Sequence, residues 1–482
     1  MNPNEIGVRL SKSVKCPVLW DDYSRDFYSV DSSSYRLKPS VIVIPRNKLD
    51  IIKIIRFAKK YNISVTPRGA GTGLVGSALG RGIIIDMKNL DEIKFGSNYV
   101  KVGTGVFKGR LDKILSKNNM FIGPNPSIGP FCTIGGMIGT NASGVHSLKY
   151  GSMIDNLIEI TMIDSYGKII KLPDKRYFQK IKNFIPSKSI ESFPKVSKNS
   201  CGYRIDKMSS KKDTHKIIAG SEGTLGIVTS AKIRTYTQPK KILLLVIYYK
   251  TLLEASKDVP KIMTLKPSAV ELVDNNIVKH IKIKTPSQSG CLLFAEFDEK
   301  IESNKKYIQN IISGKIIKTE TNKNKIKKLW SFRNSALAFS LKSITKNETM
   351  PTLIEDAVVS IRRLPLLLRI LDIISKKYDL KMIVYGHAGN GNLHIRPILT
   401  RKDKHLIKKI ASEFFSSVIE IGGSITGEHG DGLARSEFVK LQYNSEVYSA
   451  FKKIKKHFDP QNILNPGKII SEYSTVTKNL KF

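Results

Sequence analysis

Three residues in the C-terminal half of the sequence, with a further histidine beside them, have the types and spacing of a metal-binding group. His387 and His394 are separated by a turn rich in glycine and asparagine, 388–392. This spacing predicts a strand, a tight turn and a returning strand, with both imidazoles facing one point. Glu428 and His429 follow in a second segment bounded by glycines. Two histidines and one carboxylate form a common zinc-type ligand set with one position open for a substrate, whereas two histidines alone are more often structural.

A glycine-rich loop in the N-terminal half, 67–73, predicts a site for a phosphorylated ligand. It follows a predicted strand and runs into the formal GxGxxG pattern at 71–76. A Rossmann fold needs a helix directly after this pattern and an acidic residue about 20 positions further on. Here only 77–82 separate the pattern from the next predicted strand, and Asp86 comes ten residues after Gly76. The Rossmann interpretation fails, which leaves a run of backbone N–H groups that can wrap a pyrophosphate.

Two further stretches are rich in small residues. The first, 132–144, is followed by a Lys-Tyr-Gly segment at 149–151, and the second, 219–228, links two apolar runs. A turn-rich surface loop is the alternative interpretation of such stretches. Glycine pairs combined with Asn and Ser at this density are more typical of segments that line a ligand.

The elements that must position these loops can be read from apolar runs and periodicity. Residues 49–60 have helical spacing, with apolar residues at Leu49, Ile52, Ile55 and Ala58. Strands are predicted at 40–45, 62–66, 82–86, 242–249, 289–297 and 382–387. Helical stretches lie between the last three strands, which fits a separate domain built on an antiparallel sheet.

The bulk composition indicates a globular protein of more than one domain. A chain of 482 residues with 41% hydrophobic residues is long for a single core, so two or three domains are expected. No apolar run reaches the roughly 18 residues of a membrane-spanning helix. Residues 1–20 lack the apolar stretch of a secretory signal. We therefore expect a cytoplasmic protein, either free or peripheral to the inner face of a membrane.

The net charge of +39, from 80 Lys and Arg against 41 Asp and Glu, has three explanations. The basic residues are spread over the whole length, as in a compositional drift toward Lys, Ile and Asn. Attraction to an anionic membrane or acidic partner is a second explanation. Nucleic-acid binding is the least favoured, because no basic cluster with aromatic residues is present. In each case the positive field favours anionic substrates.

The four cysteines, Cys16, Cys132, Cys201 and Cys291, form no CxxC pair. This spacing argues against a disulfide framework, a zinc ribbon or an iron–sulfur cluster on this chain. Buried free thiols are the expected state.

The order of the glycine-rich segments resembles the FAD-binding domain of the vanillyl-alcohol oxidase-like flavoproteins, the PCMH type. The likeness rests on PRGAGTGL at 67–74, on CTIGGMIGTNASG at 132–144 with KYG at 149–151, and on GSEGTLGIVT at 220–229. It implies a two-lobed α+β domain with FAD extended between the lobes and the pyrophosphate on the first loop. Some members attach the flavin to a histidine in that loop. Thr72 occupies that position here, so FAD is expected to be held non-covalently.

The same resemblance implies which residues contact FAD. They are Arg68, Gly69, Ala70, Gly71, Thr72, Gly73, Leu74, Thr133, Gly135, Gly136, Asn141, Ser143, Gly144, Tyr150, Gly151, Glu222, Gly223, Ile227 and Asn465.

The C-terminal motifs resemble the FAD-linked 2-hydroxyacid dehydrogenases that act on D-lactate, D-2-hydroxyglutarate or glycolate. The resemblance rests on GHAGNGNLH at 386–394, GEHGDG at 427–432, Glu355-Asp356 after a segment at 330–333, and FDPQNILNPGK at 458–468. It implies that His387, His394 and Glu428 bind a divalent metal, with zinc as the first candidate. It also implies that His429 is the catalytic base, with a pKa near neutrality, and that Arg333 binds the substrate carboxylate.

Two positions near the predicted metal site need separate comment. Arg396, two residues after His394, either meets a substrate carboxylate or is a surface residue of a strand. Asn390 stands where the family usually has Asp, within the turn after His387. The loss of that acid could weaken a hydrogen bond to a ligand histidine and lower metal affinity.

The expected fold class is α+β, with a two-lobed PCMH-type FAD-binding domain and a cap domain made of an antiparallel sheet and helices. The expected segments are 1–35 at the N-terminus, 36–238 for FAD, 239–425 for the cap and substrate, and 426–482 returning to the FAD domain.

The expected activity is oxidation of a small D-2-hydroxy acid to the 2-oxo acid, with D-lactate as the first choice and D-2-hydroxyglutarate or glycolate as the others. Hydride would pass to flavin N5, and a metal would polarise the 2-hydroxyl. A separate acceptor is expected: an iron–sulfur subunit, a cytochrome, a quinone or an electron-transfer flavoprotein. The alternative is an oxidase of the same fold that acts on a sugar or phenol. It would not need the two histidines and Glu428 together.

Overall fold

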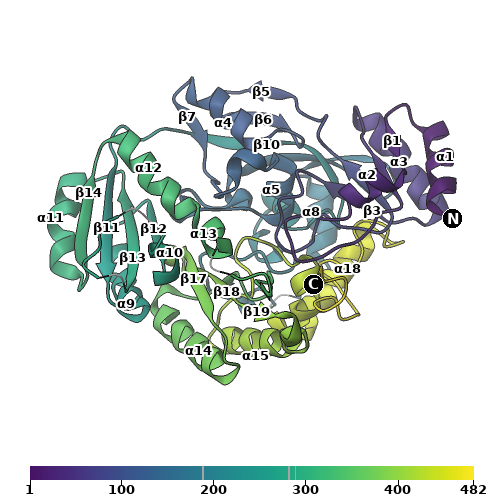
Figure 1. Ribbon diagram of the computed structural model, residues 1–482. Helices are drawn as coiled ribbons and strands as arrows, with labels where there is room; N and C mark the ends of the chain where they lie inside the picture. Colours follow the sequence, from purple (N-terminus) through teal and green to yellow (C-terminus); the bar gives the residue numbers. More distant parts are fainter. Residues whose placement is uncertain (187–188, 281–282, 288, 343, 482) are drawn as a thin grey trace.

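The computed structural model describes residues 1–186, 189–280, 283–287, 289–342 and 344–481. Figure 1 shows two N-terminal lobes on one side, a cap domain on the other, and the C-terminal segment lying against the lobes. The predicted α+β class is confirmed, with sheets in both lobes and a larger sheet in the cap. None of the helices in the described part of the chain combines the length and apolar character that crossing a bilayer requires.

The first lobe is a small, mostly parallel sheet covered by helices. Its strands lie in the order β1 (Val18–Leu19), β2 (Val41–Val43), β4 (Ile83–Asp86) and β3 (Val65–Arg68). Its helices are α1 (Pro3–Ser13), α2 (Asp22–Phe27) and α3 (Lys48–Tyr61). In α3, the Asn47 side chain accepts hydrogen bonds from the first-turn amides of Leu49 and Asp50. Asn62 ends the helix at φ 50°, so β3 begins three residues later than the predicted strand at 62–66.

The second lobe is an antiparallel sheet that carries the helices on which the second glycine-rich stretch lies. Its strands are β5 (Ile93–Phe95), β6 (Tyr99–Gly103), β10 (Ile227–Thr237), β8 (Leu157–Ile163) and β9 (Ile169–Leu172), in that order, and β7 (Met120–Ile122) pairs with the end of β10. The helices around it are α4 (Lys108–Ser116), α5 (Ile134–Thr140), α6 (Ser147–Tyr150), α7 (Met153–Asn156) and α8 (Lys175–Lys182).

The cap is built on a seven-stranded antiparallel sheet, as expected. The strand order is β14 (Lys315–Glu320), β11 (Leu243–Tyr249), β13 (Cys291–Phe297), β12 (Ala269–Val273), β17 (Met382–His387), β18 (Asn392–Pro397) and β16 (Ala357–Val358). The short strands β15 (Glu348–Thr349) and β19 (Leu399–Thr400) form a separate pair. The helices are α9 (Leu252–Met263), α10 (Asn275–Val278), α11 (Ile301–Ile311), α12 (Lys323–Asn334), α13 (Ala336–Lys342), α14 (Leu364–Lys377) and α15 (Ile407–Glu420).

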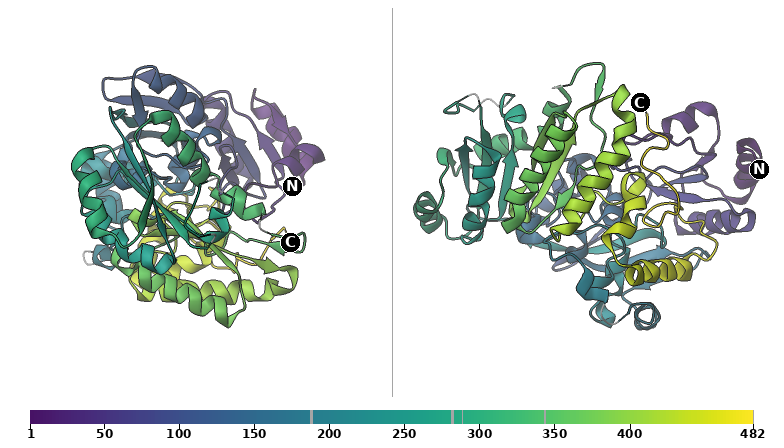
Figure 2. Two further views of the ribbon diagram at one scale, coloured as in Figure 1. Left: turned by 60° about the vertical axis from the view of Figure 1, so that its left-hand side comes forward. Right: turned by 90° about the horizontal axis from the view of Figure 1, so that it is seen from below.

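The cap helices divide between the two sides of its sheet. Figure 2, seen from below, shows α14 and α15 running side by side along one side of the cap sheet. In Figure 1, α12 and α13 lie nearer the lobes. Arg333, at the end of α12, lines the cavity described below.

The C-terminal segment returns to the first lobe. After α16 (Gly432–Arg435), α17 (Val439–Gln442) and α18 (Ser445–Phe458), the chain lies beside β3. The Val65 amide donates to the Ile463 carbonyl at 2.7 Å, and the Asn465 amide donates to the Val65 carbonyl at 2.8 Å. The residues on either side of Leu464 are thus held next to the strand that leads into the glycine loop at 67–73.

Candidate active site

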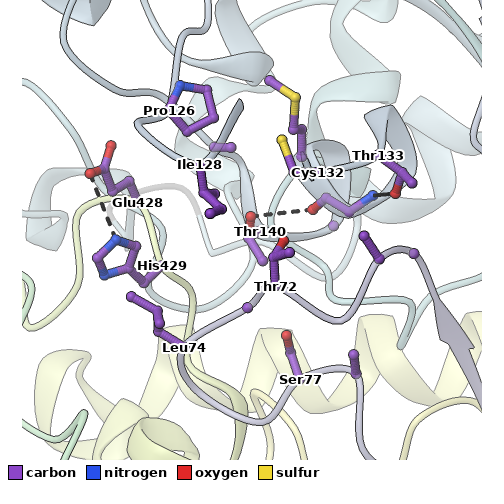
Figure 3. A pocket seen from close by; sticks show the side chains of 18 of the residues that line it. Thr72, Leu74, Ser77, Pro126, Ile128, Cys132, Thr133, Thr140, Glu428 and His429 are labelled. Atoms are coloured by element: carbon purple, nitrogen blue, oxygen red, sulfur yellow. Dashed lines mark hydrogen bonds and ion pairs between the residues drawn. The ribbon is translucent and has the colours of Figure 1, made fainter. Parts of the chain in front are cut away.

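One cavity connects the glycine-rich loops of the lobes with the polar face of the cap sheet. Figure 3 shows Thr72 and Leu74 of the first loop, Thr133 and Thr140 of the second stretch, and Glu428 and His429 around this space. Thirteen of the predicted FAD contacts line it: Arg68, Gly69, Ala70, Gly71, Thr72, Gly73, Leu74, Thr133, Gly135, Gly136, Ser143, Glu222 and Gly223. The predicted polar residues of the cap side line the same cavity: Arg333, His387, His394, Arg396, Glu428 and His429.

The first loop needs glycine for a steric reason. A Cβ atom on Gly69 would lie 2.2 Å from Thr133 Oγ1, and one on Gly71 would lie 2.4 Å from an Arg68 nitrogen. Gly71 also has φ 69°, which L-residues rarely adopt. The Arg68 guanidinium is fixed by the carbonyls of Tyr28 and Val30 at 3.3 and 2.8 Å. The guanidinium therefore anchors the start of the loop to the segment 28–30.

The second stretch is helical over part of its length. Thr133 caps α5 by accepting the Gly136 amide, and the glycines of this helix give it a surface without side chains where it lines the cavity.

The prediction that the cysteines are buried free thiols is confirmed for all four of them, Cys132 included.

Six of the predicted FAD contacts lie outside the cavity lining. They are Asn141, Gly144, Tyr150, Gly151, Ile227 and Asn465. The Asn141 side chain accepts the Ile154 amide at 2.8 Å, and the Tyr150 hydroxyl donates to Asp298 of the cap at 3.0 Å. Asn465 is fully buried, donates to the carbonyls of Ser77 and Glu222, and accepts the Thr66 hydroxyl. Its side chain thus ties the loops that line the cavity to each other.

Glu222 links the FAD loops to the loop that carries Glu428. Its Oε1 accepts the amides of Asp431 at 2.6 Å and Gly432 at 3.1 Å. Burial, followed by the charge of Asp431, raises the pKa of Glu222 to about 8. The carboxyl group therefore serves as a structural acceptor for the segment 427–432.

The register of the cap sheet places four polar side chains on one face. Tyr385 pairs with His394, and Ile383 pairs with Arg396, across the β17–β18 hairpin. Because side chains alternate along each strand, Tyr385 and His387 share a face with His394 and Arg396. The hairpin prediction from the 388–392 turn is confirmed, and Gly391 completes the turn at φ 68°. Arg396 is 2% exposed, which excludes the surface interpretation of this residue.

Three imidazoles surround one oxygen of Glu428. The Oε1 atom lies 2.8 Å from His387 Nε2, 3.4 Å from His394 Nε2 and 3.8 Å from His429 Nε2. The other oxygen, Oε2, faces the lobes. It accepts the Ser143 hydroxyl, the Gly144 amide at 2.8 Å and the Lys198 ammonium at 3.2 Å. The carboxylate is therefore fixed with one oxygen among the histidines.

This group has the donor chemistry of a divalent-cation site. One ligand atom each from Asp356, His394, Glu428 and His429 lies within 4.8 Å of the others. The predicted ligand His387 is not one of these four, but its Nε2 lies 2.8 Å from Glu428 Oε1. Burial lowers the pKa of His394 to about 4, so its imidazole is neutral and can donate a lone pair at pH 7. Burial would raise the pKa of Glu428, but His387 and Lys198 hold it well below its usual range. Neutral imidazole and ionised carboxylate together suit zinc-type ions.

Glu355 contacts the His429 imidazole and raises its pKa. Its Oε2 lies 2.7 Å from His429 Nδ1, and its Oε1 lies 2.5 Å from Arg435 Nη2. Burial opposes protonation of His429, but the charges of Glu355 and Asp356 overcome it and raise the pKa to about 9. These carboxylates thus hold the pKa of His429 above the near-neutral range that the sequence predicted.

Arg333 and His387 share another buried carboxylate, Glu271. Glu271 Oε1 lies 2.6 Å from His387 Nδ1, and Oε2 lies 2.5 Å from Arg333 Nη2. Burial would raise the pKa of Glu271, but Arg333 and His387 lower it to about 2. Arg396 is paired more loosely, with Nη2 3.7 Å from Glu355 Oε2. In the described part of the chain no hydrogen-bond acceptor meets Nε of either arginine.

Asn390 does not act where the sequence suggested. Its side chain contacts the hydroxyls of Ser147 and Ser197 at 3.2 and 3.3 Å. The hydrogen bond to the His387 imidazole, which the family Asp was expected to support, comes from Glu271 instead. The Asp-to-Asn difference therefore changes the charge near the turn without removing a partner of His387.

Glu271 and Lys198 contact the predicted site residues, but the sequence did not predict them as part of the site. Glu271 interrupts the apolar strand Ala269–Val273, and all of that strand is buried. An acid inside an otherwise apolar strand is a signal of a buried charge pair, because an unpaired carboxylate there is costly. Lys198 gave no such signal, because Lys is common along the whole chain.

Comparison with known proteins supports the assignment of both halves. Residues 39–173 match the family described as FAD binding domain, and residues 238–469 match the FAD linked oxidases, C-terminal domain. A solved structure of alkyldihydroxyacetonephosphate synthase superposes with a TM-score of 0.70 at 18% identity, covering 96% of this chain and 86% of that one. This likeness shows the fold.

Two relatives are similar over almost their whole length. The glycolate oxidase subunit GlcD of Bacillus subtilis is 29% identical, with 95% of each chain covered. A D-lactate dehydrogenase of Archaeoglobus fulgidus is also 29% identical, with 89% of this chain and 91% of the relative covered. The predicted family is confirmed: the chain belongs to the FAD-linked oxidoreductases that combine an FAD-binding domain with an FAD-linked oxidase C-terminal domain.

Proposed function

We propose that the protein oxidises a small D-2-hydroxy acid, with D-lactate as the first candidate, to the 2-oxo acid. The main support is a single cavity that joins the glycine-rich FAD loops to a buried group of histidines, carboxylates and arginines. The relatives named D-lactate dehydrogenase and glycolate oxidase subunit support the same substrate class. An oxidase for sugars or phenols would have no use for two buried arginines beside this group.

FAD and a divalent cation would supply the chemistry that side chains lack. Non-covalently held FAD, on the loops around Thr72 and Gly136, would accept the hydride, and a divalent cation at His387, His394 and Glu428 would favour the negative charge that develops on the 2-hydroxyl oxygen. Zinc fits the donor set best.

The chain's own residues would bind and orient the substrate. Arg333 and Arg396 line the cavity as buried cations with free N–H groups, so each can donate to a carboxylate. Each also lies beside a carboxylate that contacts a histidine, Glu271 for His387 and Glu355 for His429. A substrate carboxylate held by Arg333 leaves the 2-hydroxyl near the histidines, where His429 can take its proton.

Electrons would then leave for a separate acceptor. We propose a partner protein, a cytochrome or a quinone in this role. The relative that is named as a subunit supports an assembly of more than one chain. The net charge of +39 would favour an acidic or anionic docking surface on the acceptor.

Anaerobic bleaching of the flavin absorbance at about 450 nm tests the proposal. D-lactate, L-lactate, glycolate and D-2-hydroxyglutarate are added in turn, with and without a chelator. Bleaching by one D-acid, lost with chelator and restored by zinc, is the expected result. Full FAD occupancy with no bleaching by any of the four acids would refute the substrate class. Bleaching that survives complete removal of metal would refute the cation's role alone.

Flavin reduction by the cation-loaded protein is expected to become faster with rising pH until the His429 imidazole is largely neutral. His429 accepts a proton only when neutral, and its pKa in the cation-free protein is raised to about 9. Below the pKa of His429 the rate should fall about tenfold for each pH unit. A cation bound beside His429 would lower this pKa, and turnover is expected to need the cation, so the profile is measured on zinc-loaded protein, where the acid limb should lie below pH 9.

Glu355→Gln provides the matched control for this pH dependence. Glutamine still offers an acceptor to Nδ1, but it removes the negative charge that raises the pKa of His429. The acid limb of kcat/KM should therefore move down by about 1–2 pH units. An unchanged limb in this variant would show that another group is the base.

A further inference from the structure

Lys198 is a buried cation directly behind Glu428. Its side chain is 2% exposed, and its ammonium nitrogen lies 3.2 Å from Glu428 Oε2. The lysine is not among the residues that line the cavity. It can therefore affect substrate and cofactors only through Glu428 and through its charge.

Glu428 Oε2 has two other donors, both from the second lobe. The Ser143 hydroxyl and the Gly144 amide contact the same oxygen. Gly144 has φ 99°, and a Cβ at this position would lie 2.0 Å from the Asn125 carbonyl oxygen, so its backbone is closely fixed. The orientation of Glu428 Oε2 is thus set by three donors, of which only Lys198 brings a positive charge.

We propose that Lys198 is a positioning residue whose ammonium charge limits how tightly the histidine–glutamate group binds a divalent cation. This inference rests on the proposed cation site at His387, His394 and Glu428. By neutralising the charge of Glu428, the lysine leaves more of the positive charge of the cation available to the substrate oxygen. Lys198 thereby lowers the affinity of the site for the cation.

Removal of Lys198 has two opposite effects on cation binding. Loss of a donor loosens Glu428, which weakens binding, as is usual when partners of a metal ligand are removed. Loss of the positive charge removes a repulsion that acts over several ångströms and is little screened in a buried site. Because two donors to Oε2 remain, the electrostatic effect is the larger one.

The experiment is a titration of Zn²⁺ into chelator-stripped, FAD-loaded protein, in competition with a chromophoric chelator. Three variants are compared with the natural chain: Lys198→Met, which removes the charge, Lys198→Arg, which keeps it, and Ser143→Ala, which removes a neutral donor to the same oxygen. Lys198→Met should bind Zn²⁺ at least about tenfold more tightly. Lys198→Arg should stay within about threefold of the natural chain, and Ser143→Ala should bind more weakly.

FAD content and thermal midpoint are measured for every variant, and Lys198→Gln replaces Lys198→Met if the methionine variant does not fold. Equal or weaker Zn²⁺ binding by the neutral variants would overturn the proposal. Tightening in Ser143→Ala as well would also overturn it, because that variant leaves the charge in place. If the natural chain binds no Zn²⁺, the cation site of the proposed function fails and this inference fails with it. If only the Lys198 variants behave unexpectedly, the proposed function stands.

Discussion

Replacing His429 by alanine is expected to slow flavin reduction by the D-2-hydroxy acid by about 10²–10⁴-fold. The imidazole is the most accessible of the three around Glu428, with 21% of its side chain exposed, and it lines the cavity. Glu355 holds Nδ1, so Nε2 is the atom that is free to take the hydroxyl proton. FAD should remain bound, because its predicted contacts are on the glycine loops and do not include His429.

The measurement is stopped-flow reduction of the flavin at saturating substrate, with FAD occupancy determined for each preparation. His429→Asn is the matched variant: it keeps a donor for Glu355 Oε2, whereas Oε1 stays paired with Arg435 in both variants. Both variants should be slow, and added imidazole should restore part of the rate to His429→Ala only. Reduction at the natural rate in a fully FAD-loaded alanine variant would show that His429 is not the base.

Much of the fold could be predicted from local patterns. The hairpin between His387 and His394 follows from a Gly-Asn-Gly-Asn turn between apolar runs, and the register then places both imidazoles on one face. The failure of the Rossmann interpretation also rested on local spacing, and β4 does follow the first loop without a helix between them. Such features depend on residues close in sequence, where steric rules are strong.

The less predictable features depend on contacts between distant segments. Lys198 and Glu428 are 230 positions apart, and no local pattern connects them. Asn465 was expected at the flavin, yet its position is set by hydrogen bonds to Ser77, Glu222 and Thr66. The pKa of His429 could not be anticipated either, because the charge that raises it comes from Glu355 on another segment.

Replacing Arg333 by lysine is expected to lower kcat/KM for the D-2-hydroxy acid about 30-fold to several thousand-fold. The guanidinium can donate two parallel hydrogen bonds to a carboxylate, whereas an ammonium group cannot reproduce that geometry. Lysine keeps a positive charge beside Glu271, so the carboxylate that holds His387 stays paired. The loss should therefore appear mainly in the substrate concentration needed for half-maximal flavin reduction, with Zn²⁺ binding close to that of the natural chain.

Arg396→Lys is the matched comparison, because Arg396 lines the same cavity, is equally buried and has a looser carboxylate partner at 3.7 Å. If Arg333 alone holds the substrate carboxylate, Arg396→Lys should change the half-saturating concentration of D-lactate by less than about fivefold. A large loss in Arg396→Lys with little change in Arg333→Lys would place the carboxylate at the Glu355 end of the site. If both variants lose kcat/KM strongly and equally with D-2-hydroxyglutarate but not with D-lactate, the two arginines bind two separate carboxylates. The pair of variants therefore decides between a monoacid and a diacid substrate.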